Sequence, residues 1–243
     1  MTMIAFFTHH KCASSALVAF LAELSKRSAL GFFTSHLGSA RPPAAGYDLC
    51  CLTNAQYAAV RGQGTGPALH LIRNPLSVVL SAYHSHRTSH SIDGWPLLAA
   101  QRARLLAADR ETGMLLTAQF CNSEEFYPET PGPLHAMRHW DYDDPAIDTL
   151  RIEEGLDRLT DFLRAALGPA GDALVWPDQA DFAFEKLAGR RAGETDDASH
   201  YRTGDADAWK SELPREVIGY VVGECGGVLE RFYPESLDWA GRV

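Results

Sequence analysis

A lysine and two serines stand together near the N-terminus, where a short apolar run gives way to a helical pattern. Lys11 follows the apolar run, and Ser14 and Ser15 directly precede the next apolar periodicity. A helix N-terminus presents unpaired backbone N–H groups and a partial positive charge, to which lysine adds a point charge. Cys12 and Ala13, between them, are small enough to let the backbone wrap an anion. The segment predicts a phosphate site, although the same residues could form an ordinary helix N-cap.

Arg73 and Ser81 form a second candidate anion site. Arg73 directly follows the apolar run 68–72, and a helical periodicity begins after Pro75. Ser81 lies eight positions after the arginine, two helical turns away, where its hydroxyl can point back toward the same end of the sheet. The planar fork of an arginine and a serine hydroxyl placed in this way can clamp one phosphate.

Short apolar runs alternate with helical periodicities, and these elements must position the candidate residues. Strands are expected at residues 3–7, 29–33, 47–52, 68–72 and 147–152. Helices are expected to begin near residues 14, 55, 75, 156 and 214. The alternation predicts an α/β fold whose mostly parallel central sheet is flanked by helices in three layers. Ligands of such folds bind beyond the carboxyl ends of the strands, so function is expected in the strand-to-helix loops.

Length, composition and charge set further bounds. With 243 residues, 46% of them hydrophobic, the chain is long enough for a single large domain over residues 1–243. The net charge of −9 argues against a nucleic-acid partner, so any bound anion must be gathered by a local cluster of basic groups. No segment approaches the roughly 20 apolar residues of a membrane span, and the five cysteines show no C-x-x-C spacing. We therefore expect a soluble, cytoplasmic protein with reduced thiols.

Residues 86–144 interrupt the alternation. This stretch is polar, contains four prolines and carries several aromatic residues, among them Trp95, Phe126 and Trp140. We expect helices and loops that form a cap on the acceptor side of the site. The sequence does not indicate the oligomeric state.

Four ordered segments resemble those of sulfotransferases that use 3′-phosphoadenosine 5′-phosphosulfate (PAPS). The segment 11–15 resembles the K-x-G-(S/T)-(S/T) loop that holds the 5′-phosphosulfate, with Ala13 where glycine is usual. Arg73 and Ser81 have the spacing of the segment that recognises the 3′-phosphate. The third segment is similar to the family's R-K-G…W loop, with threonine where lysine is usual; it comprises Tyr201, Arg202, Thr203 and Gly204, followed by Trp209. Residues 150–156 resemble the strand-turn segment L-R-Y-E-D-L.

The resemblance implies a P-loop-like fold and transfer of a sulfuryl group from PAPS, with the desulfated nucleotide PAP as product. The acceptor would be a hydroxyl or amine of a small molecule or carbohydrate-like compound; carbohydrates, lipids and natural products all remain open. Lys11 would be catalytic, because it would stabilise the charge that develops on the bridging oxygen. No metal is required. The implied cofactor-binding residues are Lys11, Cys12, Ala13, Ser14, Ser15, Arg73, Ser81, Tyr201, Arg202, Thr203 and Gly204.

The general base is expected among the histidines. His36 follows the run 29–33, where some carbohydrate-acting sulfotransferases carry an acidic base, and imidazole suits proton abstraction near neutral pH. Cytosolic-type relatives carry Lys-Thr-His after the third strand, where this chain has Leu-Thr-Asn at 52–54. A cluster at His84, His86 and His90 has spacings that could hold a metal, but no H-E-x-x-H accompanies it, and we expect no metal site.

Two other classes of function remain open. A nucleotide-dependent kinase also cradles phosphates at a strand-to-helix turn, but the chain lacks the G-x-x-x-x-G-K-[ST] loop. A noncatalytic nucleotide-binding module would retain Arg73, Ser81 and Arg202 but would gain nothing from an essential Lys11.

Overall fold

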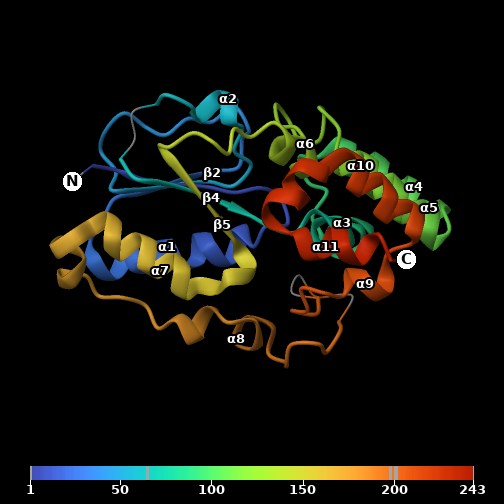
Figure 1. The fold of residues 1–243 in the computed structure, drawn as a ribbon. Coiled ribbons are helices and arrows are strands. Elements are labelled where there is room, and N and C mark those ends of the chain that lie inside the picture. The colour runs from blue at the N-terminus through green and yellow to red at the C-terminus, as the bar shows by residue number, and fades with distance from the viewer. Residues whose placement is uncertain (1, 64–65, 197–198, 200–201, 243) are drawn as a thin grey trace.

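A parallel β-sheet lies at the centre of the computed structural model, which describes residues 2–63, 66–196, 199 and 202–242 (Figure 1). Within these residues five strands form the sheet in the order β2-β3-β1-β4-β5, and every neighbouring pair is parallel. The strands are β1 (Ile4–Phe7), β2 (Phe32–Ser35), β3 (Leu49–Leu52), β4 (Ala68–Ile72) and β5 (Ile147–Arg151). The predicted α/β class with a parallel sheet is confirmed.

The three middle strands, β1, β3 and β4, are buried along their whole length. Their sequences are apolar apart from the buried His70 in β4, which fits strands that are covered on both faces. Phe7 is in register with Leu52 on one side and His70 on the other. The chain therefore leaves these strands at the same edge, and the loop after β1 lies between the loops after β3 and β4.

β2 begins three residues later than expected, because the first helix runs farther. Ala29 has φ 52° and closes α1 (Ser14–Ser28) with its N–H bonded to Ser25 O. The next N–H, of Leu30, also donates to Ser25 O at 2.9 Å. A left-handed residue that ends a helix in this way is usually glycine, so an alanine gave no sequence signal of the helix end.

Helices cover both faces of the sheet. α1 and α7 (Gly155–Leu167) lie side by side on one face, and their buried Phe20, Leu24 and Leu163 pack against it (Figure 1). The other face packs against α2 (Tyr57–Val60) and Trp140. The expected three-layer arrangement is thus present.

A second group of helices lies beside the sheet and shares one apolar core with α3 (Pro75–His84). Asn74 begins α3 by accepting a hydrogen bond from Leu76 N at 3.0 Å, and proline occupies the first turn, where its missing N–H does no harm. Residues 86–144 are built of helices and loops, as expected. The group comprises the π-helical turn η1 (Ser85–Ser89), α4 (Pro96–Ala107), α5 (Arg110–Cys121), α6 (Pro133–Arg138), α10 (Arg215–Phe232) and α11 (Pro234–Ala240).

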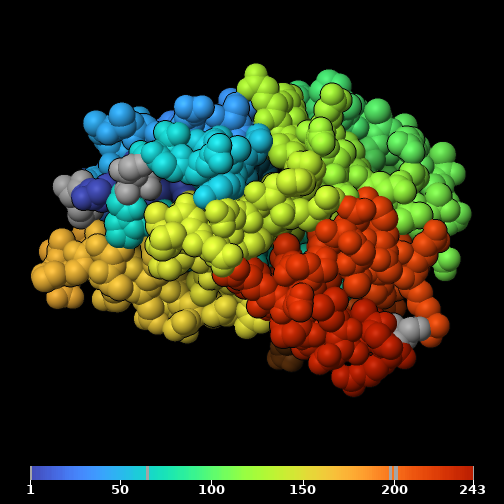
Figure 2. Space-filling view, turned by 45° about the horizontal axis from the view of Figure 1, so that its top comes forward, coloured from blue at the N-terminus to red at the C-terminus, as the bar shows by residue number. Residues whose placement is uncertain are grey.

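The C-terminal helices α10 and α11 pack against the apolar core around α3. α10 is kinked at Cys225 (φ −110°, ψ 20°), next to the Gly226-Gly227 pair. Arg231 Nη1 bonds Asp143 Oδ1 at 2.7 Å, and Figure 2 shows the red C-terminal residues packed against the yellow-green chain before β5.

Among the described residues, no helix is long and apolar enough to cross a membrane. Short helical segments complete the chain: η2 (Ile152–Glu154), η3 (Gly168–Ala173), η4 (Gln179–Phe182), α8 (Phe184–Ala188) and α9 (Trp209–Glu212).

Candidate functional site

Three of the predicted segments meet at one cavity of about 210 Å³ at the carboxyl edge of the sheet. The cavity is open to solvent at the point where the loop after β1, the start of α3 and the chain before α9 come together. Nine of the predicted cofactor-binding residues line it: Lys11, Ala13, Ser14, Ser15, Arg73, Ser81, Arg202, Thr203 and Gly204. Tyr201 lies outside the described residues.

The loop after β1 contains two left-handed residues that are not glycine. Lys11 has φ 66° and Ala13 has φ 52°, a conformation that disfavours residues with a Cβ. Ala13 stands where the resembling loops carry glycine, so the sequence departure coincides with a position that requires this conformation. The first turn of α1 follows at once, and its opening N–H groups have no partner within the helix.

Cys12 is not among the described residues that line this cavity, but it lines the neighbouring apolar cavity. Its side chain is 1% exposed and belongs to the apolar core around α3, and its N–H donates to His9 O at 3.1 Å. Thr8 Oγ1 donates to Cys12 O at 3.2 Å. The N–H and carbonyl of Cys12 thus hold the loop together, and its side chain packs in the core.

Lys11 combines partial burial with a neighbouring cation. Burial, and then the positive charge of Arg73, lower the pKa of its amine to about 7. Arg73 Nη1 also donates to Lys11 O at 3.1 Å, which ties the end of β4 to the loop after β1. Two cations held this close favour a bound anion, which would restore the protonated amine.

α3 carries both the predicted Ser81 and a second serine that the sequence did not single out. Ser77 lies one turn before Ser81 on the same face of the helix and also lines the cavity. Its Oγ donates to Ala206 O at 2.7 Å, which fastens the chain after Gly204 to α3. A serine at i−4 from the motif serine is the signal that could have found it.

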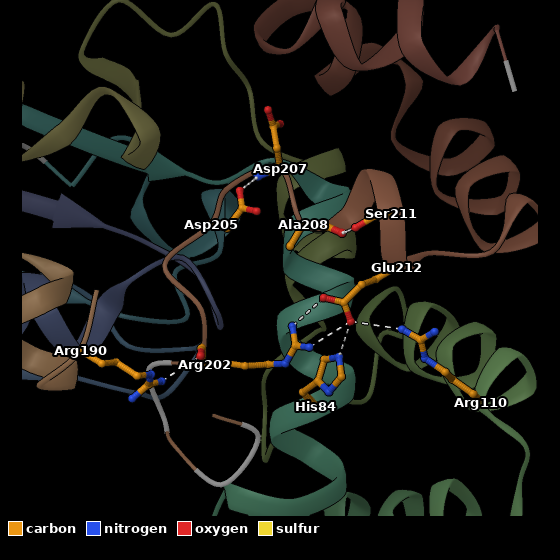
Figure 3. A network of polar contacts seen from close by, with 9 residues as sticks. All are labelled: His84, Arg110, Arg190, Arg202, Asp205, Asp207, Ala208, Ser211 and Glu212. Carbon is orange, nitrogen blue, oxygen red and sulfur yellow. Dashed lines mark hydrogen bonds and ion pairs between the residues drawn. The ribbon is translucent and has the colours of Figure 1, made fainter. Parts of the chain in front are cut away.

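Arg202 is held by a carboxylate beside the cavity (Figure 3). Its Nη1 and Nη2 donate to the two oxygens of Glu212 at 2.9 and 3.0 Å. Glu212 Oε2 also contacts His84 Nε2 at 3.3 Å and Arg110 Nη2 at 3.1 Å. Burial raises the pKa of Glu212, but the hydrogen bonds and charge of Arg202, together with His84, outweigh it and lower the pKa. The Glu212 carboxylate is therefore ionised and already forms an ion pair with Arg202.

The chain around Gly204 approaches its neighbours closely. Gly204 has φ 65°, and a Cβ at this position would lie 2.6 Å from the ring of Phe184. Trp209, which was expected to pack under this segment, is 1% exposed and lines the cavity wall. Arg190 Nη2 donates to Arg202 O at 2.8 Å and holds the segment from the other side.

The candidate histidines do not all line the cavity. His36 is exposed, bonds Thr53 Oγ1 through Nδ1 at 2.8 Å and is not among the described residues that line the cavity. His10 and His90 do line it. His84 pairs with Glu212, whereas the rings of His86 and His90 contact each other with their centroids 6.1 Å apart. In the described part of the chain, no group of three or more His, Cys, Asp or Glu side chains could hold a metal ion.

A larger apolar cavity of about 590 Å³ adjoins the first. The two share wall residues, among them Ala16, Arg73 and Phe184. The apolar cavity runs between α1 and the start of α7, and residues 150–156, the fourth segment of the resemblance, supply part of its wall. Its apolar lining includes Leu17, Leu71, Leu150, Ile152, Leu156 and Phe182. A polar and an apolar chamber side by side suit a ligand with phosphates at one end and an aromatic ring at the other.

Known structures share this fold. Over 99% of this chain and 89% of the other, it is similar to mouse sulfotransferase SULT7A1 complexed with PAP, with a TM-score of 0.56 and 13% identity. Over 93% of this chain and 80% of the other, it is similar to retinol dehydratase in complex with androsterone and inactive cofactor PAP, with a TM-score of 0.51 and 14% identity. No protein-family model and no curated protein matches the sequence. The chain has the sulfotransferase fold.

Proposed function

We propose that this protein is a PAPS-dependent sulfotransferase. It transfers the sulfuryl group of PAPS to a hydroxyl or amine of a small-molecule or carbohydrate-like acceptor and releases PAP. One observation carries the proposal: the loop after β1, the Arg73–Ser81 pair and the Arg202–Gly204 segment, which are far apart in sequence, line a single cavity. The PAP complexes of the two structures with the same fold support the choice of nucleotide.

The two adjoining cavities accommodate the two ends of PAPS. The phosphosulfate lies against Lys11 and the first turn of α1, and the 3′-phosphate lies against Arg73, Ser81 and Arg202. The adenine ring enters the apolar cavity beside Phe182. In this arrangement the helix N-terminus and the cations face the phosphates, and the apolar walls face the base.

Sulfuryl transfer then proceeds in line. The acceptor oxygen or nitrogen attacks sulfur, a new bond to sulfur forms, and the bond between sulfur and the bridging oxygen breaks. The electron pair of that bond stays on the 5′-phosphate of PAP. The Lys11 amine lies on the same cavity wall and neutralises this developing charge, while a base accepts the acceptor's proton.

Calorimetric titration with PAP tests the nucleotide site. Wild type is expected to bind PAP with micromolar or tighter affinity, and Arg73→Ala is expected to weaken binding by about 10²-fold, because a charge-assisted phosphate contact contributes about 1.5–3 kcal/mol. The matched control is Arg104→Ala, which removes an exposed arginine on α4 and should leave the affinity unchanged. Binding of ATP with magnesium but not of PAP would contradict the proposal and favour a kinase or nucleotide sensor.

Glu212→Gln tests whether the internal carboxylate competes with the nucleotide for Arg202. A neutral amide cannot hold the guanidinium as an ion pair, so the fraction of molecules with Arg202 available should rise and PAP affinity should increase about 3- to 10-fold. The same titration with Glu216→Gln, an exposed carboxylate on α10, controls for the change in net charge. Weaker binding by Glu212→Gln would show instead that Glu212 positions Arg202 for the phosphate.

A further inference from the structure

Two buried histidines join the loop after β1 to the sheet. His9 is the second residue after β1, and His70 lies in the middle of β4. Their Nε2 atoms are 2.7 Å apart, and their rings are nearly perpendicular, at 87°. His9 is 1% exposed and His70 is fully buried. The pair is therefore a side-chain contact between a loop and a strand that solvent does not reach.

Trp140 covers this pair. The indole stacks on the His70 ring with centroids 3.6 Å apart and planes 12° apart. The His9 ring meets the same indole edge-on at 5.7 Å. Because Trp140 is itself only 4% exposed, the three rings form one closed aromatic cluster, and His9 is the member that the loop contributes.

The contact between the two Nε2 atoms admits one proton. One ring must donate and the other must accept, so the accepting ring carries its own proton on Nδ1. Neither Nδ1 has a hydrogen-bond partner among the described residues. A further proton on the donating ring would create a buried, unpaired charge. One more, on the accepting Nε2, would set two N–H groups against each other. The geometry thus fits a neutral pair.

Burial acts on the pKa of both rings in the same direction. It lowers the pKa of His9 to about 3. Burial, followed by the charge of His9, also lowers the pKa of His70 well below its ordinary value. Among the described residues, no carboxylate shifts the pKa of either ring. Nothing in the surroundings therefore compensates a positive charge on the pair.

The titratable and charged groups around the cluster are neutral or positive, or are already bonded elsewhere. The chain before β5 supplies Tyr142, whose ring lies 5.7 Å from His70 and whose hydroxyl donates to Met137 O. β3 supplies the thiol of Cys50, whose pKa burial raises to about 12. α2 supplies Tyr57, which contacts Trp140 and donates to the carboxylates of Asp141 and Asp144. The cations that follow in the chain, Lys11 and Arg73, disfavour further positive charge.

The backbone of His9 starts the turn that presents Lys11 to the cavity. His9 O accepts the N–H of Cys12 at 3.1 Å, and the left-handed residues Lys11 and Ala13 complete the turn. Arg73 Nη1, just beyond β4, donates to Lys11 O. β4 thus holds this loop at two points, through the His70 ring at its start and through Arg73 at its middle.

We propose that His9 and His70 are positioning residues that hold the loop after β1 in its nucleotide-binding conformation only while both rings are neutral, so that acid releases the loop. The inference rests on the proposed function and deepens it by naming a control of the same site. Release here means that His9 leaves His70 and Trp140 and becomes hydrated.

The sign of the effect follows from proton counts. In the released loop the histidines regain pKa values of about 6.5. Between about pH 3 and 6.5 the released state therefore binds more protons than the positioned state, and the positioned state loses stability as pH falls. Each ring changes the release equilibrium by up to about tenfold per pH unit, and the two together by up to about 100-fold. Above about pH 6.5 the stabilisation is complete.

Native-state hydrogen exchange of wild type tests the release directly. The Cys12 amide, which donates to His9 O, reports the loop, and the Cys51 amide in β3 reports unfolding of the sheet. Protection of Cys12, corrected for the intrinsic exchange rate, should fall at least about tenfold per pH unit between pH 6 and 5 and stay below that of Cys51. A Cys12 protection independent of pH, or equal to that of Cys51, would overturn the proposal.

A neutral replacement separates the protons from the packing. His9→Gln/His70→Gln keeps one donor and one acceptor in contact at every pH, so its Cys12 protection should not depend on pH. Between pH 7.0 and 5.0, calorimetric PAP affinity should fall about 3- to 10-fold more in wild type than in this variant. Protonation of PAP itself affects both proteins alike.

The outcomes distinguish this inference from the function on which it rests. Wild type that binds no PAP at any pH would refute the proposed function, whatever the exchange data show. PAP binding with the same pH dependence in wild type and His9→Gln/His70→Gln would refute only the role of the pair. If the variant does not fold, the two wild-type amides still decide.

Discussion

Lys11→Met should slow sulfuryl transfer by about 10²- to 10³-fold, the usual loss when one group that stabilises developing charge is removed. Methionine preserves the length and apolar stem of the side chain, so the loop after β1 should keep its conformation. PAP should still bind through Arg73 and Arg202, with an affinity reduced much less than the rate. Single-turnover release of PAP from PAPS, measured beside calorimetric titration with PAP, separates the two effects.

The pH dependence of PAP binding gives a second readout of the same residue. Because the pKa of Lys11 is lowered to about 7, the free protein holds a protonated amine only below that pH, and bound phosphate raises the pKa again. Between the free and bound values, binding takes up a proton, so PAP affinity should fall by up to about tenfold per pH unit as pH rises above 7. Lys11→Arg stays charged and should remove this slope. A slope that persists in Lys11→Arg would assign the proton to another group.

Gly132→Ala should destabilise the protein by about 3 kcal/mol, at the upper end of the usual cost of overpacking. Gly132 precedes α6, and a Cβ there would lie 2.1 Å from the carbonyl oxygen of Cys121 at the end of α5. Backbone cannot move aside as a flexible side chain can, and Gly132 N is bonded to Ser123 O at 2.8 Å. For a chain of this size the loss corresponds to a fall of about 6–12 °C in the melting temperature.

Gly219→Ala is the matched control. Gly219 lies inside α10, where an added Cβ would meet nothing within 4 Å. Alanine favours a helix over glycine by about 0.8–1 kcal/mol, so this variant should melt slightly above wild type. Denaturant unfolding of both variants checks the pair, and equal stability of Gly132→Ala and wild type would contradict the close approach of α5 and α6.

The sheet and the loops that line the cavity of Lys11 and Arg73 were predictable because their signals are local. An apolar run that ends in Arg73-Asn74-Pro75 predicts both β4 and the start of α3. Parallel strands end at the same edge of a sheet, so Arg73 is expected to lie near Lys11. The order of the motifs along the chain indicated the sulfotransferase fold. Predicting these features requires only the sequence around each residue and the geometry of a parallel sheet.

The surroundings of His10, Cys12 and His36 were not predictable in the same way. The contact of His10 with His86 joins residues 76 positions apart, and it depends on how a π-helical turn packs against the first loop. The packing of Cys12 in the core depends on the left-handed backbone at Lys11 and Ala13. Neither lysine nor alanine is a sequence signal for that conformation. His36 follows a strand as expected, but it follows an edge strand, two positions from β1 in the sheet.

The loop after β1 sends three consecutive side chains into three different environments. His10 enters the aromatic wall built by residues 86–144, Lys11 enters the cavity, and Cys12 enters the core around α3. A single peptide bond thus joins the residue in the aromatic wall to the residue in the cavity. Under the proposed function, residues 86–144 can be substituted to suit a new acceptor while the nucleotide pocket stays unchanged. The choice of acceptor would then evolve separately from the binding of the nucleotide.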